Sequence, residues 1–254
     1  MKKNFSSISW SLFGKLVVSL EICYIVNVSA FLFYIVKGNG DALIYIQEVL
    51  EIGAYRTLLM ALPALISGYC PFTKPREIEN GLLNDSFRFV VYRYVAGGVC
   101  AAIGFIIFAI LLRMFLPPLI LTEGRINYIN SRLHADLYLN YPYYIIIAFH
   151  GALIFMCGGY VSVMYVAIGY LTQNKYIVFL MLFVVLQCIL VFENILKFPA
   201  FLKFSNVFSG CFTISTNEFL NILWAQLLCF IMMIPWVMVV HFKRKESKYA
   251  YTDC

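Results

Sequence analysis

The residues of this chain that could take part in chemistry are few, and most lie in one polar stretch. Thr73–Arg93, TKPREIENGLLNDSFRFVVYR, is the long polar run in the middle of an otherwise apolar sequence. Its charged residues are Lys74, Arg76, Glu77, Glu79, Asp85, Arg88 and Arg93. A charged segment between two apolar segments must lie in water, and its Lys and Arg content predicts the cytoplasmic face of a membrane.

This polar stretch also carries helix signals. Thr73 can cap a short helix whose first positions hold Pro75, Glu77 and Glu79, as the beginning of a helix prefers. We expect a short cytoplasmic helix near residues 76–85 that ends around Gly81 to Asp85. The alternative is a solvated connector that binds nothing.

The sequence contains no recognisable catalytic or metal-binding constellation. There is no G-x-x-x-x-G-K-[ST] phosphate loop, no H-E-x-x-H and no G-x-S-x-G. No two of the eight cysteines form a C-x-x-C pair, and the three histidines are scattered. We therefore expect neither an enzyme nor a directly bound cofactor or metal.

Two polar residues fall inside the first apolar segment. Glu21 and Asn27 lie within residues 16–37, and a carboxylate inside a membrane span is a candidate for a transport pathway. Glu21 is only six residues past Lys15, about 9 Å along a helix. The headgroup zone is therefore the alternative location for Glu21.

The composition is that of an integral membrane protein. Of the 254 residues, 62% are hydrophobic and 13% are charged, whereas soluble domains carry about a quarter charged residues. We expect a single all-α membrane domain over residues 1–254. The net charge of +6 comes from residues at the ends of the apolar segments, which favours lipid headgroups and not nucleic acid.

Continuous apolar runs of about 20 residues predict six transmembrane helices. They lie near residues 16–37, 56–72, 94–115, 143–170, 176–196 and 219–240. We expect an interfacial N-terminal segment at 4–15, an outer loop at 119–141 and a broken, re-entrant outer segment at 197–218. Of the 19 Lys and Arg residues, this arrangement puts twelve inside and seven outside, which predicts that both termini are cytoplasmic.

The fourth apolar segment carries a stripe of small residues. Gly151, Gly158, Ser162 and Gly169 share one face of a helix, where another helix can approach closely. A bulky residue at Gly158 should disturb this packing surface more than one at Val161, on another face. His150 stands at the outer end, where a hydrogen-bonded interfacial histidine is expected more than a proton relay.

The polar stretch resembles an element of type-2 ABC exporter permeases. The resemblance rests on E77-I-E-N-G81, followed by Arg88 and by Arg93 at the start of an apolar helix. Leu82 replaces the threonine that usually follows the glycine, and the usual proline near Ser86 is missing. The layout of spans and loops fits the same family over nearly the whole chain.

The resemblance implies a permease subunit in the cytoplasmic membrane of a bacterium. It would couple ATP hydrolysis by separate cytoplasmic ATPase subunits, which hold the ATP and Mg²⁺, to export. The short helix would contact the ATPase through Arg76, Glu77, Ile78, Glu79, Gly81, Leu82 and Asp85. The partner in the membrane would be a second copy or a related permease.

The aromatic and aliphatic span walls suggest an amphipathic substrate: a peptide, bacteriocin, antibiotic or lipid-like molecule. The alternative is a non-transporting immunity, sensor or assembly protein that acts through helix contacts.

Overall fold

The computed structural model describes residues 86–115, 126, 135–172, 175–209, 212 and 214–252. The first two expected spans, the N-terminal segment and the short cytoplasmic helix at residues 76–85 lie outside these residues. The described part is helical and contains no β-strand. Its elements are α4 (Ser86–Phe115), α6 (Ala135–Asn140), α7 (Tyr143–Thr172), α8 (Lys175–Ile195), η2 (Ala200–Leu202), α9 (Phe204–Ser209) and α10 (Glu218–Thr252).

Three of these helices are long and apolar enough to cross a membrane. The qualifying stretches are Ser86–Met114, Tyr143–Thr172 and Glu218–Lys243, which correspond to the third, fourth and sixth expected spans. A helix of 30 residues is about 45 Å long, and the hydrocarbon core is about 30 Å thick. Helix α8 corresponds to the expected fifth span, but its apolar stretch, Leu180–Ile195, is shorter than those of the three long helices.

Two helices extend well beyond the expected spans. Helix α4 begins at Ser86, eight residues before position 94, and α10 continues to Thr252, past position 240. Neither extension contains glycine or proline, so nothing in the local sequence ends the helix where the hydropathy falls. Hydropathy marks the part of a helix that fits in lipid and not the end of the helix itself.

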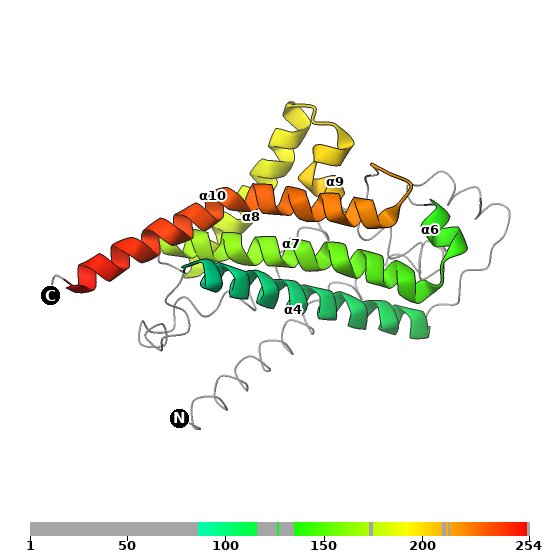
Figure 1. The fold of residues 1–254 in the computed structure, drawn as a ribbon, viewed down its shortest axis with the longest axis horizontal. Helices are drawn as coiled ribbons and strands as arrows, with labels where there is room; N and C mark the ends of the chain where they lie inside the picture. Colours follow the sequence, from blue (N-terminus) through cyan, green and yellow to red (C-terminus); the bar gives the residue numbers. More distant parts are fainter. Residues whose placement is uncertain are drawn as a thin grey trace, which may run out of the picture.

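The three long helices run side by side (Figure 1). Helix α4 is antiparallel to α7 and α10, so Ser86, Thr172 and Thr252 lie toward the same end of the molecule. Helix α8 leaves this common direction and turns back through η2 and α9. The residues that follow the polar stretch therefore lie toward the same end as the basic C-terminal part of α10.

Helix α7 is the centre of the described structure. Within the most apolar window of each long helix, 89% of the residues are buried in α7, against 35% in α4 and 11% in α10. Its most extensive packing is against α4, followed by α10. An apolar helix that is buried on all sides is expected at the middle of a bundle.

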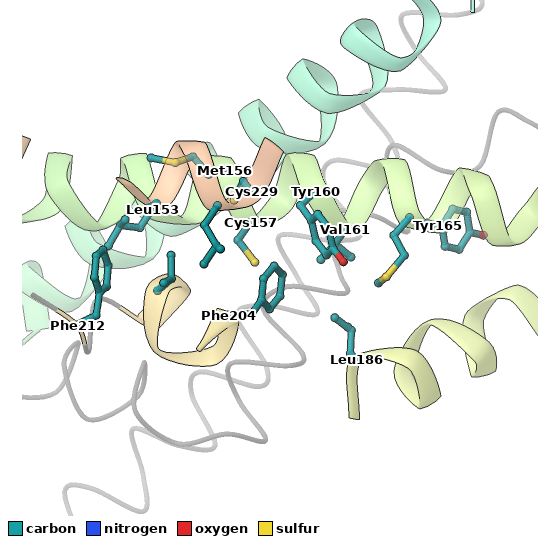
Figure 2. Close-up of a cluster of buried hydrophobic side chains, with 14 of the residues drawn as sticks. Leu153, Met156, Cys157, Tyr160, Val161, Tyr165, Leu186, Phe204, Phe212 and Cys229 are labelled. Atoms are coloured by element: carbon teal, nitrogen blue, oxygen red, sulfur yellow. The ribbon is translucent and has the colours of Figure 1, made fainter. Parts of the chain in front are cut away.

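The largest core cluster surrounds the middle of α7 (Figure 2). Leu153, Cys157 and Tyr160 of α7 meet Phe204 of α9 and Cys229 of α10, all of them buried. The rings of Tyr160 and Phe204 have their centroids 4.7 Å apart. Tyr160 is about 26 Å along α7 from Tyr143, so the segment between α8 and α10 reaches the middle of the central helix.

The segment between α8 and α10 is broken into short pieces, and its turns satisfy their own backbone. After α8, Lys197 adopts a φ of 51° and its N–H donates to the Asn194 carbonyl, while that of Phe198 donates to Glu193. This is a Schellman ending, in which a glycine usually takes the left-handed position. The buried Phe204, with Val207 of the following turn, then anchors the segment.

Candidate functional site

The predicted ATPase-contact residues cannot be placed, because they lie outside the described residues. They are Arg76, Glu77, Ile78, Glu79, Gly81, Leu82 and Asp85, and the pathway candidates Glu21 and Asn27 also lie outside. The structure does describe the helix that directly follows Asp85. Of the two basic residues in the resemblance, Arg88 is exposed and Arg93 is buried within α4.

Arg93 is held two turns inside α4, not at the start of the helix. Its guanidinium carbon lies 5.2 Å from the centroid of the Phe89 ring and 5.9 Å from that of Tyr92. Stacking on aromatic faces is typical of a partly desolvated guanidinium. The third span was expected near residues 94–115 with Arg93 leading into it; in the structure Arg93 already lies inside α4 and is part of its packed surface.

The small-residue stripe of α7 lies against α4, and the approach is very close. A Cβ added at Gly158 would lie 2.8 Å from the Gly97 carbonyl oxygen and would collide with the Ala101 Cβ. Conversely, a Cβ added at Gly97 would lie 2.7 Å from the Gly158 carbonyl oxygen and would collide with the Ser162 Cβ. The two backbones can approach in this way only because both sides carry small residues.

The seam is formed by two matching patterns. Gly97-x-x-x-Ala101 in α4 faces Gly158-x-x-x-Ser162 in α7, and each is a small residue followed by another one turn later. We call these four residues the small-residue seam. Of the other two stripe residues, Gly151 faces Phe105 and Ile106 of α4 at van der Waals distance, and Gly169 is buried.

Sequence reasoning found the α7 side of the seam and missed the α4 side. The Gly97-Gly98 pair and Ala101 were not predicted to pack closely, although they too are small residues one helical turn apart, the pattern that identified the α7 side. Gly98 lies against the backbone of Phe155, and a Cβ there would be 2.7 Å from its carbonyl oxygen. Val161, expected on a more tolerant face, is fully buried, because α7 is surrounded and does not present a single packing side.

Polar contacts tie the three long helices together. Gln226 of α10 donates its Nε2 to the Tyr94 hydroxyl of α4 at 3.0 Å, and Trp236 donates its Nε1 to the Tyr160 hydroxyl of α7 at 3.1 Å. At the other end of α4, the Tyr143 hydroxyl donates to the Ala109 carbonyl at 2.8 Å. In an apolar surrounding such bonds specify which helix faces which.

His150 is buried and hydrogen-bonded. Its Nε2 lies 2.6 Å from the Tyr138 hydroxyl of α6, and its ring packs edge-on against Phe105 and Phe149. Residues 119–141, expected as an outer loop, thus include a short helix that docks onto the beginning of α7. His150 acts here as a packing and anchoring residue.

Two buried polar residues, one near the end of α8 and one near the beginning of α10, were not predicted. Glu193 accepts the backbone N–H of Phe204 at the start of α9. Asn221, fully buried, accepts from the backbone N–H groups of Ile214 and Ser215 and donates to the Ser215 carbonyl and Glu218. Both residues satisfy the backbone of a broken segment, which explains polar residues in apolar surroundings.

The contacts among the described residues are helix packing and hydrogen bonds. Among them, no group of three or more His, Cys, Asp or Glu residues could hold a metal ion. No protein-family model, curated protein or solved structure matches the chain. The site must therefore be interpreted from its own geometry: a close-packed pair of helices, α4 and α7, of which α4 follows the charged polar stretch in the sequence.

Proposed function

We propose that the chain is the membrane-spanning subunit of an ATP-driven exporter, which receives force from separate ATPase subunits through residues 76–85. The observation that carries the proposal is the continuity between this stretch and the seam. The described part of α4 begins at Ser86, the residue after Asp85, and Gly97 lies only eleven positions further along. A displacement of residues 76–85 would be passed directly to α4.

The close contact between α4 and α7 supports this transfer of force. Packed elements transmit displacement because protein interiors are dense and deform little. Since α7 also contacts α10 and α9, a rotation of α4 would be passed to the centre of the bundle. Such a rotation would change the face that the bundle presents to a second copy, or to a related permease, where an amphipathic substrate would leave.

The test reverses the two carboxylates that we expect to contact the ATPase. Glu77→Lys with Glu79→Lys should leave the amount of protein in the membrane unchanged, because exposed charges contribute little to stability. It should reduce co-purification of the ATPase or uncouple ATP hydrolysis from export. Glu123→Lys with Asp136→Lys makes the same charge change in the segment expected outside and should leave both measurements unchanged.

A double variant at residues 77 and 79 that binds the ATPase and exports normally would reduce the stretch to a connector. The second candidate function, a non-transporting immunity, sensor or assembly protein, is favoured by the tight and fully packed surroundings of α7. The two are separated by the unmodified chain: an exporter subunit retains an ATPase through mild detergent purification, and a helix-contact protein does not.

A further inference from the structure

Helix α8 exposes one side along most of its length. At about 100° per residue, six exposed positions lie within about 40° of one direction around the helix, and we call them the outer face of α8. They are Ile177, Leu180, Val184, Cys188, Val191 and Ile195. The opposite side holds Val178, Leu182 and Leu186, which are buried in the main core. The bundle therefore covers one side of α8 and leaves the other exposed.

Amide side chains border the outer face of α8, and this distinguishes it from the exposed side of α4. Gln187 and Asn194 are both exposed and, being seven residues apart, lie within about 20° of each other around the helix. Between Val95 and Ile110 of α4, by contrast, every exposed residue is apolar. Lipid satisfies an apolar side, whereas Asn and Gln inside a membrane form hydrogen bonds between helices. The exposed side of α4 therefore suits lipid, and the outer face of α8 suits another helix.

The apolar part of α8 is also short for a bilayer. Leu180–Ile195 is about 24 Å long, whereas the hydrocarbon core is about 30 Å thick. Helix α8 in addition leaves the common direction of the three long helices (Figure 1). Oligomerisation is one of the ways in which a short hydrophobic helix is accommodated in a membrane. A protein contact at the outer face would remove a mismatch that lipid would otherwise have to absorb.

We propose that the outer face of α8 binds the same face of a second copy of the chain, with Gln187 and Cys188 at the centre of the contact. Two copies inserted in the same orientation are related by a two-fold axis along the membrane normal, so residues near the axis meet their own counterparts at equal depth. An amide both donates and accepts a hydrogen bond, so Gln187 can pair with its counterpart, which a charged side chain could not do.

The size of the exposed surface fits a contact between two copies. Together with Met181 and Phe192 on its borders, the outer face exposes on the order of 700 Å², close to the roughly 800 Å² that each partner contributes to a stable interface. The proposal names the surface that a second copy would use in the proposed exporter. It holds equally for a protein that acts through helix contacts, because it rests on α8 and not on ATP-driven transport.

The native cysteine of the outer face can report on this contact. In isolated membranes, copper(II) phenanthroline should oxidise the Cys188 thiols of two neighbouring copies to a disulfide, with two electrons passing to copper and two protons to water. The product is a dimer band on a non-reducing gel that a reductant removes, and Cys188→Ser should lose it. In the Cys188→Ser background, Val184→Cys on the same face should restore the band, whereas Ile110→Cys, similarly exposed on α4, should not.

The amide at the centre of the contact gives a quantitative test. Gln187→Leu should raise the dissociation constant of the dimer in mild detergent about three-fold, since a hydrogen bond between membrane helices contributes about 0.6 kcal/mol. Analytical ultracentrifugation over a range of protein concentrations measures this constant. An unchanged constant would place Gln187 away from the contact and overturn the proposal.

Other outcomes of the cross-linking would also overturn the proposal. A dimer band that persists in Cys188→Ser, or equal bands for Val184→Cys and Ile110→Cys, would indicate another interface or random collision. A chain that gives no band in membranes and is monomeric in mild detergent would have lipid, or its own residues 1–85, against the outer face. Retention of the ATPase is measured separately, so failure here is distinguishable from failure of the proposed function.

Discussion

Glycine and serine at the helix crossing are the residues on which the described core depends most directly. Gly97 and Gly158 each lie against the backbone of the other helix, and Ala101 and Ser162 complete the contact. In lipid, helices gain little from apolar burial alone, so close packing and hydrogen bonds must hold them together. A side chain added at this point would therefore clash with the backbone of the facing helix, which cannot move aside as a flexible side chain can.

Gly158→Leu should destabilise the protein by about 1–3 kcal/mol, because the new side chain overpacks against Gly97 and Ala101. The measurement is thermal unfolding of the purified protein in detergent. Ala148→Leu, at an exposed position of the same helix, is the control and should change stability little. Similar losses at both positions would mean that the close approach is unimportant for stability.

Lys197→Gly should stabilise the protein by about 1 kcal/mol. Lys197 holds a left-handed φ of 51°, which costs a residue with a Cβ roughly this amount and a glycine almost nothing. Lys203→Gly is the matched control, because Lys203 has a φ of −72° and gains nothing from glycine. The melting temperature of both variants in thermal unfolding checks the sign. A higher melting temperature for Lys203→Gly, or a lower one for Lys197→Gly, would contradict the explanation.

At the scale of elements, hydropathy identified the long helices, but their ends and contacts needed the structure. The third, fourth and sixth expected spans correspond to α4, α7 and α10, because a long continuous apolar run has few other solutions. The extension of α4 back to Ser86 and of α10 on to Thr252 was missed, since a helix continues past its apolar part when no breaker intervenes. Spacing revealed the Gly158 side of the seam, but no single-helix pattern could name α4 as its partner.

Short polar anchors were the least predictable elements. Glu193 and Asn221 look like charged or polar interruptions in apolar sequence, and their roles depend on backbone groups brought in by folding. The dock between α6 and α7 through Tyr138 and His150 is of the same kind. Such residues respond to local backbone geometry, which has no period in the sequence.

The contact between α7 and α10 should be measurable through one hydrogen bond. In a double-mutant cycle, Tyr160→Phe and Trp236→Phe should show a coupling of about 0.6 kcal/mol, the usual size for a hydrogen bond between membrane helices. The cycle is measured by unfolding in detergent. A cycle of Tyr143→Phe with Trp236→Phe should give no coupling, because Tyr143 bonds to α4. Coupling in the second cycle and none in the first would reverse the assignment.

At the scale of the whole molecule, the three long helices define two ends. Ser86, Thr172 and the C-terminal part of α10 lie toward one end, and α6 lies toward the other (Figure 1). From the balance of Lys and Arg in the sequence, we propose that the first of these ends faces the cytoplasm. The antiparallel direction of α4 relative to α7 and α10 brings these three segments to a common end.

Labelling of single introduced cysteines should reveal this orientation. In intact cells, a membrane-impermeant maleimide should label Asp136→Cys, whose position is exposed at the α6 end, and should label Asn80→Cys only after permeabilisation. The unmodified chain gives the background from the native cysteines. Labelling of position 80 in intact cells and of position 136 only after permeabilisation would invert the topology and remove the ATPase from the side on which the proposed contact lies.

The burial of α7 also has a consequence for biosynthesis. A ribosome completes α7 long before α10, yet α10 supplies Trp236 for Tyr160 and the opposite wall of the core. Until α10 is inserted, the central helix lacks the partner that covers its α10 side. A premature stop codon anywhere after Thr172 and before Glu218 should therefore yield a membrane-inserted but incomplete bundle, which quality-control proteases would recognise and remove, and the steady-state amount of such truncated chains should be low even though most of the protein has been made.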